Sequence, residues 1–124
     1  MNEYQNNGEV MKVTRGDILR VDLGEGINPD FIVVRGERPV LVIQNNVANK
    51  HSPVTIIAPI TTTHKRIPTF IKIMPEESGL ERESYVNCAN FLTIDNRQIL
   101  KKTGKLSAKV MERVAKGLRE SIGI

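Results

Sequence analysis

The sequence predicts a small, mainly β domain with mostly antiparallel strands and one α-helix packed at its C-terminal end. Two patterns predict this fold class. Residues 16–23 and several later runs are short, rich in β-branched side chains and separated by turn residues, whereas residues 107–122 repeat apolar side chains every four residues. A chain of 124 residues can form one hydrophobic core, so we expect one domain.

The first elements follow from local composition. Residues 1–13 are polar and rich in asparagine, and we expect a disordered N-terminal tail followed by a domain over residues 14–124. Residues 16–23 (GDILRVDL) alternate in the period-two pattern of a half-buried strand. A loop rich in Gly, Asn and Pro comes next, and then a short apolar run over residues 31–34.

The middle of the chain predicts the centre of the sheet. Residues 38–43 (RPVLVI) are apolar on both faces and predict a central strand, with Pro39 at its first residue because proline cannot donate a ladder hydrogen bond. Residues 45–53 indicate a turn region. Residues 54–60 form a second β-branched run, which is broken by Pro59 and ends in Thr61-Thr62-Thr63.

The last third predicts two further strands and a helix. Residues 69–73 and 84–88 are shorter strand candidates, with a turn signal between them at residues 75–79. Ser107 is a suitable N-cap and Gly123 can end the helix. Its apolar positions share a four-residue spacing: Val110, Val114, Leu118 and Ile122.

Few residues are available for redox or metal chemistry. Cys88 is the only cysteine, so no intrachain disulfide can form and a cytoplasmic setting is expected. With Cys88, His51 and His64 as the only soft ligands, we expect no zinc site and no cofactor. We also expect no signal peptide and no membrane span, because no apolar run is long enough.

Charge is segregated along the chain, whose net charge is +4. Residues 38–75 carry five basic and no acidic side chains, and residues 101–124 carry seven basic and two acidic ones. Residues 1–37 and 76–100 are each net negative by three. Such segregation can concentrate a polyanion on part of the surface, although a solvated basic face would give the same pattern.

Three segments together resemble the MazF/PemK family of bacterial toxins. They are Arg15-Gly16-Asp17-Ile18 leading to Asp22-Leu23; Arg38-Pro39-Val40-Leu41-Val42-Ile43-Gln44-Asn45 with Ser52-Pro53 and Ala58-Pro59-Ile60-Thr61 after it; and Glu81-Arg82-Glu83-Ser84-Tyr85-Val86 running to Thr93-Ile94-Asp95. Each motif is weak alone, but their order and spacing over residues 14–122 make the resemblance specific.

The resemblance implies an SH3-like barrel, a homodimer and a sequence-specific endoribonuclease toxin. Such an enzyme cuts single-stranded RNA without a metal, leaving a 2′,3′-cyclic phosphate and a 5′-hydroxyl. It also implies a labile acidic antitoxin of the MazE type as a partner. The family's catalytic arginine falls on Arg38 and its catalytic threonine on Thr61.

The chemistry needs only a few protein groups, because RNA carries its own nucleophile, the 2′-hydroxyl beside each phosphate. An arginine fork can stabilise the developing charge on phosphorus, and a threonine hydroxyl can donate to the same phosphate. The alternative for Arg38 is a surface ion pair with Glu37 or Asp22, and threonine is common at strand ends in any case.

Further candidates are less specific. His64 is a possible auxiliary acid or base, against an exposed loop histidine. Lys65 and Arg66 are candidates for backbone phosphates and Asn90 for a base edge. The few aromatic residues fall mostly in strand contexts, so we expect recognition to depend on backbone charge and hydrogen bonds rather than on stacking.

Two departures from the family leave other functions open. The family's glycine-rich loop before the R-P pair is replaced by residues 26–37, in which only Gly36 matches the glycines, and Leu92 stands where an arginine is frequent. The alternatives are a gyrase-poisoning toxin on the same fold and a non-catalytic nucleic-acid-binding module.

Overall fold

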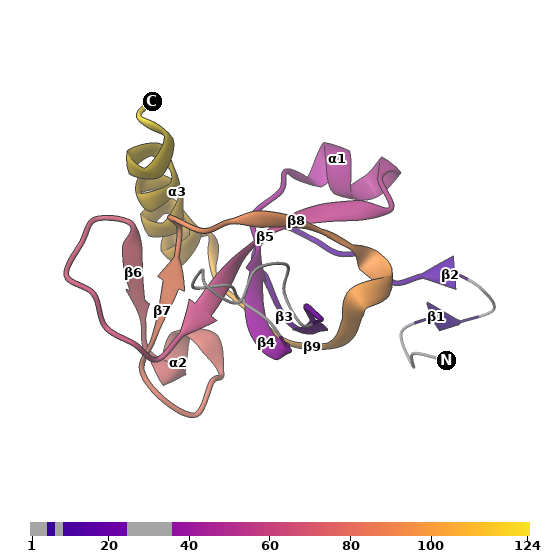
Figure 1. Cartoon of the computed structure of the whole chain (residues 1–124), viewed down its shortest axis with the longest axis horizontal. Helices are drawn as coiled ribbons and strands as arrows, with labels where there is room; N and C mark the ends of the chain where they lie inside the picture. Colours follow the sequence, from indigo (N-terminus) through magenta and orange to yellow (C-terminus); the bar gives the residue numbers. More distant parts are fainter. Residues whose placement is uncertain (1–4, 7–8, 25–35) are drawn as a thin grey trace.

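A seven-stranded antiparallel sheet and a C-terminal helix make up the domain (Figure 1), so the predicted fold class is confirmed. The computed structural model describes residues 5–6, 9–24 and 36–124. The sheet has the order β6-β7-β5-β4-β3-β9, and β8 pairs with β5 away from this path. No helix among the described residues has the length and apolar character needed to cross a membrane.

The elements have these bounds. The strands of the sheet are β3 (Asp17–Asp22), β4 (Glu37–Val42), β5 (Val54–Thr61), β6 (Phe70–Ile73), β7 (Ser84–Asn87), β8 (Leu92–Asp95) and β9 (Ile99–Lys105). The helices are α1 (Asn46–His51), α2 (Pro75–Ser78), a 3-10 turn (Asn96–Gln98) and α3 (Ala108–Ile122). Two short strands, β1 (Gln5–Asn6) and β2 (Glu9–Val10), pair with each other outside the sheet.

The strands predicted from apolar runs are confirmed as β3, β4, β5, β6 and β7, apart from the run at residues 31–34, which lies outside the described residues. Pro39 is the third residue of β4 rather than its first, and it pairs with Arg20 of β3. The β4–β5 ladder begins only at Val40, so Pro39 lies beyond the paired part of that edge. A proline is tolerated there because no ladder bond to β5 is required of it.

Two predicted turns are helices. Residues 46–51, expected to be a turn, form α1, because the Asn45 side chain caps it by accepting a hydrogen bond from the backbone N–H of Ala48 at 2.9 Å. The buried Asn49 amide then holds α1 to the sheet: its oxygen accepts from Thr55 of β5 at 2.7 Å and from Gln44 at 2.9 Å. Residues 75–78 form α2, which ends at Gly79 with a φ of 76°.

The apolar side chains divide between the two faces of the sheet. On one face, Leu41, Ala58, Ile60 and Val86 pack with α3 in a first cluster. On the other face, a second cluster closes between β3, β4, β5, β8 and β9, with members that include Val21, Val40, Val42, Ile57 and Ile94. Strands β8 and β9 supply part of this cluster, although the sequence did not predict them.

The N-terminal boundary of the domain differs from the expectation. Val13, which we expected to lie in the tail, is 6% exposed and belongs to the second cluster, against which Met11 also packs. The packed domain therefore begins before Thr14. After β3, the backbone N–H of Gly36 donates to the carbonyl of Gly24 at 2.6 Å, so these two residues lie side by side.

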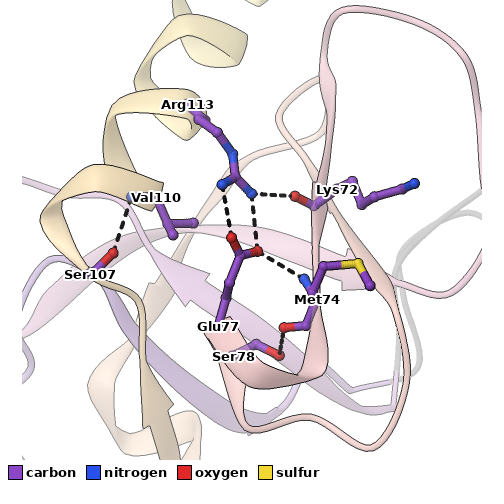
Figure 2. A network of polar contacts seen from close by, with 7 residues as sticks. All are labelled: Lys72, Met74, Glu77, Ser78, Ser107, Val110 and Arg113. Atoms are coloured by element: carbon purple, nitrogen blue, oxygen red, sulfur yellow. Dashed lines mark hydrogen bonds and ion pairs between the residues drawn. The ribbon is translucent and has the colours of Figure 1, made fainter.

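Helix α3 has the predicted caps, with the Ser107 hydroxyl accepting from the N–H of Val110 at 3.2 Å and Gly123 left-handed at its end. Figure 2 shows how Arg113 of α3 ties the helix to the sheet: its guanidinium donates two hydrogen bonds to Glu77 of α2, at 2.9 and 3.1 Å, and one to the carbonyl of Lys72 in β6. The bonds from Arg113, and secondly from the backbone of Met74, lower the pKa of Glu77 from 4.5 to about 2.

This pair makes stability depend on pH. A carboxyl whose folded pKa is depressed stabilises the fold above its unfolded pKa, and the contribution is lost as the pH falls through the folded value. Glu77→Gln should therefore lower the free energy of unfolding at pH 7 by about 1 kcal/mol, allowing for solvent screening. Urea unfolding should show this difference shrinking as the pH falls from about 4.5 towards 2. The adjacent exposed Glu76→Gln is the matched control, and equal behaviour of the two variants would contradict the assignment.

Gly104 of β9 tests the packing of α2 on the sheet. A Cβ built at Gly104 lies 2.7 Å from the backbone oxygen of Ser78, closer than real Cβ atoms approach. Gly104→Ala must therefore displace backbone, and we expect a loss of about 1–3 kcal/mol in the free energy of unfolding, measured by chemical denaturation. An unchanged unfolding midpoint would show that α2 is not packed against β9 as described.

Candidate active site

The face of the sheet opposite α3 changes from a buried interior to an open surface along β5. Ile57 on this face is buried in the second cluster, whereas Thr61, four residues further, is only half-buried. Beyond Pro59 the strand no longer pairs with β4 in the ladder, and its last two residues pair with β7 instead. The open end of this face, from β4 across β5 and β7 to β6, is called the open face below.

Arg38 lies at the β4 side of the open face. It pairs with the buried Val21 of β3, so its side chain is on the same face as the second cluster, yet it is exposed. The expected alternative partners are engaged elsewhere: the Glu37 carboxylate pairs with Arg20 at 3.6 Å, and Asp22 accepts from the N–H of Gly24 at 2.9 Å. Within the described ranges, the guanidinium has only a long contact to the Glu37 carbonyl, at 3.4 Å.

Thr61, the last residue of β5, is on the same face. The β4–β5 ladder ends at the pair Val40–Pro59, two residues before Arg38 is reached on β4 and two residues before Thr61 is reached on β5. Side chains two residues apart along a strand lie on the same face, so Arg38 and Thr61 share the face of Val40 and Pro59. The Thr61 hydroxyl oxygen accepts the N–H of Thr63 at 3.1 Å. This contact orients the hydroxyl and leaves its O–H able to donate.

Two aromatic rings lie beside Thr61. Tyr85 of β7 is the cross-strand partner of Thr61 and is 4% exposed. The imidazole of His64 stacks on the Tyr85 ring, with centroids 4.7 Å apart and planes 10° from parallel. His64 is thus an exposed residue held against the open face, and no local pattern in the sequence predicts Tyr85 as its partner.

Glu83 and Lys72 lie next to Tyr85 on the open face. The Tyr85 hydroxyl donates to Glu83 at 2.6 Å, and Lys72 of β6, which pairs with Tyr85 in register, lies 3.6 Å from the same carboxylate. The hydrogen bond from Tyr85, and secondly the charge of Lys72, lower the pKa of Glu83. The bond to Glu83 raises the pKa of Tyr85, which therefore remains a protonated donor at neutral pH.

Lys65 and Asn90 also lie at the open face. The Lys65 ammonium is 5.6 Å from the centroid of the Phe70 ring in β6, and Asn90 accepts a hydrogen bond from Asn87 of β7 at 3.0 Å. Phe70 and Asn87 are register partners, so both contacts belong to one end of the β6–β7 pair. Arg66 is exposed in the same loop as His64, which Figure 1 shows sweeping outwards between β5 and β6.

Other reactive groups lie away from the open face. Cys88 is buried against α3, and burial raises its pKa to about 11, so at neutral pH it is a thiol rather than a nucleophilic thiolate. Among the described residues, no group of three or more His, Cys, Asp or Glu side chains gathers as a metal site would require. An open hollow of about 480 Å³ between Arg15, Asn46 and α3 contains none of the candidate residues.

Comparison with known proteins gives a consistent assignment. The family model described as "PemK-like, MazF-like toxin of type II toxin-antitoxin system" matches residues 14–122. The Endoribonuclease EndoA of Bacillus subtilis (strain 168) is 34% identical over 116 residues, which covers 92% of this chain and 97% of the relative.

Solved structures show the same fold. A mycobacterial endoribonuclease in complex with its cognate antitoxin superposes with a TM-score of 0.75 at 27% identity, covering 90% of this chain and 96% of that one. A MazF from Deinococcus radiodurans superposes with a TM-score of 0.74 over 94% of this chain and 99% of that one; its identity of 19% makes this a likeness of fold alone.

Proposed function

The chain belongs to the PemK-like, MazF-like toxin family of type II toxin–antitoxin systems, and we propose that it is an endoribonuclease that cuts single-stranded RNA at the open face. The observation that supports this most directly is the face shared by two neighbouring strand ends. Two residues beyond the Val40–Pro59 pair, this face carries an arginine without a carboxylate partner in the described chain and a threonine whose O–H can donate.

In the proposed reaction, the ribose 2′-hydroxyl attacks the adjacent phosphorus and displaces the 5′-oxygen of the next nucleotide. The products are a 2′,3′-cyclic phosphate and a 5′-hydroxyl. Arg38 binds two non-bridging oxygens and stabilises the charge of the pentavalent state, since its planar donors match phosphate geometry and stay protonated. Thr61 donates its hydroxyl to the same group, and neither residue has to form a bond to phosphorus.

The reaction also needs a group that removes the proton of the 2′-hydroxyl and one that protonates the leaving 5′-oxygen. An arginine holds its proton too tightly to be a good base, although it can donate weakly to the leaving oxygen. His64 is the candidate side chain at the open face whose imidazole nitrogens could accept or donate this proton. Lys65, Arg66 and Asn90 would then bind the flanking nucleotides and contribute to sequence specificity.

The cellular setting follows from the family. We propose a cytoplasmic homodimer that a cognate acidic antitoxin of the MazE type inhibits by covering the open face. The basic residues 38–75 suit such a partner. Solved relatives include an endoribonuclease with its cognate antitoxin and a MazE–MazF complex.

End mapping tests the proposed function. Purified protein incubated with a long single-stranded RNA in EDTA should produce discrete fragments with 2′,3′-cyclic phosphate and 5′-hydroxyl ends. Intact RNA of shifted mobility would instead indicate a binding module, and no effect on RNA with inhibition of gyrase would indicate a topoisomerase poison. Activity that EDTA abolishes and Mg²⁺ restores would contradict the metal-free reaction.

Substitution tests the two proposed catalytic residues. Arg38→Ala should lower kcat/KM by about 10²–10³-fold, the usual cost of losing one preorganised donor. Arg38→Lys should recover only part of the lost kcat/KM, because an ammonium lacks the planar fork. Thr61→Val should also lower the cleavage rate, whereas Thr61→Ser keeps the hydroxyl and should keep most of the rate. Initial rates on a short RNA that contains the mapped site measure each effect.

Arg119 of α3 offers the matched control. It is an exposed arginine on the helix that covers the opposite face of the sheet, so Arg119→Ala should cleave at the wild-type rate. If Arg38→Ala cleaved RNA as fast as this control, the assignment of Arg38 would be wrong.

A further inference from the structure

His64 and Tyr85 form an aromatic pair on the open face. His64 is exposed, but it is not free in the loop, because one face of its imidazole lies parallel to the Tyr85 ring at 4.7 Å between centroids. A near-parallel ring pair of this kind contributes a favourable contact that restricts rotation of the side chain. His64 therefore presents its ring in a defined orientation.

Tyr85 is itself held in place by burial and by a hydrogen bond. It is 4% exposed, it lies on β7 between β5 and β6, and its hydroxyl donates to Glu83 at 2.6 Å. Lys72 lies 3.6 Å from the same carboxylate, which holds Glu83 in place. The buried Tyr85 ring thus supports the exposed His64 ring, and the imidazole is the outer of the two.

The pair stands one strand away from the proposed scissile phosphate. Tyr85 is the register partner of Thr61, and directly opposite side chains in an antiparallel pair have Cβ atoms about 5 Å apart. A nucleotide adjacent to a phosphate at Thr61 would place its base at the level of the imidazole. Lys65, over the Phe70 ring on the next strand, is a cation for the following phosphate in the same direction.

We propose that His64, supported by Tyr85, is a stacking platform for the RNA base next to the phosphate bound by Arg38 and Thr61. This inference rests on the proposed function and adds a base contact to it. Every nucleobase has a π-face, so the platform would favour an unpaired, unstacked base without selecting one by hydrogen bonds. It also revises the expectation that stacking contributes little to recognition.

Binding to an uncleavable RNA tests the platform. The probe is a short RNA that spans the mapped cleavage site, with a 2′-deoxy residue at the attacking position and 2-aminopurine as the flanking base. His64→Ala should weaken binding by about 5- to 150-fold, the range for loss of one base–aromatic stack. The fluorescence quenching of 2-aminopurine should disappear in the same variant. His64→Phe, which keeps a flat ring without titratable nitrogens, should restore both affinity and quenching.

His51 provides the matched control, since it is an exposed histidine at the end of α1, and His51→Ala should bind the probe like the wild type. Tight binding and full quenching in His64→Ala would overturn the platform, as would His64→Phe that binds as weakly as His64→Ala. Both results would leave cleavage by the wild-type protein intact and so would not affect the proposed function. Failure of the wild-type protein to cleave any RNA would overturn the proposed function, and this inference with it.

Discussion

The shared edge of β5 is the constraint on which the rest of the structure depends. Its first half pairs with β8 over Val54–Ile57, its last two residues pair with β7, and its β4 ladder ends at Pro59. Because β5 changes partners in this way, its first half lies over the buried second cluster and its last residues lie at the open face. Thr61 is the residue at the open end, and its position there is a consequence of backbone pairing rather than of any contact made by its side chain.

Local patterns in the sequence predicted the elements that bury one regular set of side chains. The alternation at residues 16–23 and the four-residue repeat in α3 report directly which side chains are buried, and the structure confirms both. Helix α1 was missed because it is short and polar, and its stability comes from the buried Asn49 amide bonded to Gln44 and Thr55. Strand β9 was missed because most of its side chains are exposed, so burial leaves no period in its sequence.

The candidate site shows the same division between local and distant information. Arg38 and Thr61 were proposed from a motif, and the strand registers show that both lie on one face at the open end of neighbouring strands. Nothing in the local sequence links His64 to Tyr85, or Tyr85 to Thr61. Those relations arise when β7 adds to the last two residues of β5, which is a contact between distant segments. The aromatic pair was therefore beyond prediction from composition and spacing.

Arg113 and Arg38 differ in how far their donors are engaged within the described chain. Arg113 donates to Glu77 through two bonds and to a backbone carbonyl through a third, so it stabilises the attachment of α3 and has little remaining capacity for a ligand. Arg38 is exposed beside a buried apolar cluster, and the nearby carboxylates are engaged by Arg20 and by the Gly24 backbone. A guanidinium in that position retains donors for an anion, because no carboxylate of the described residues engages them. Under the proposed function this anion is an RNA phosphate, whose oxygens match the planar fork.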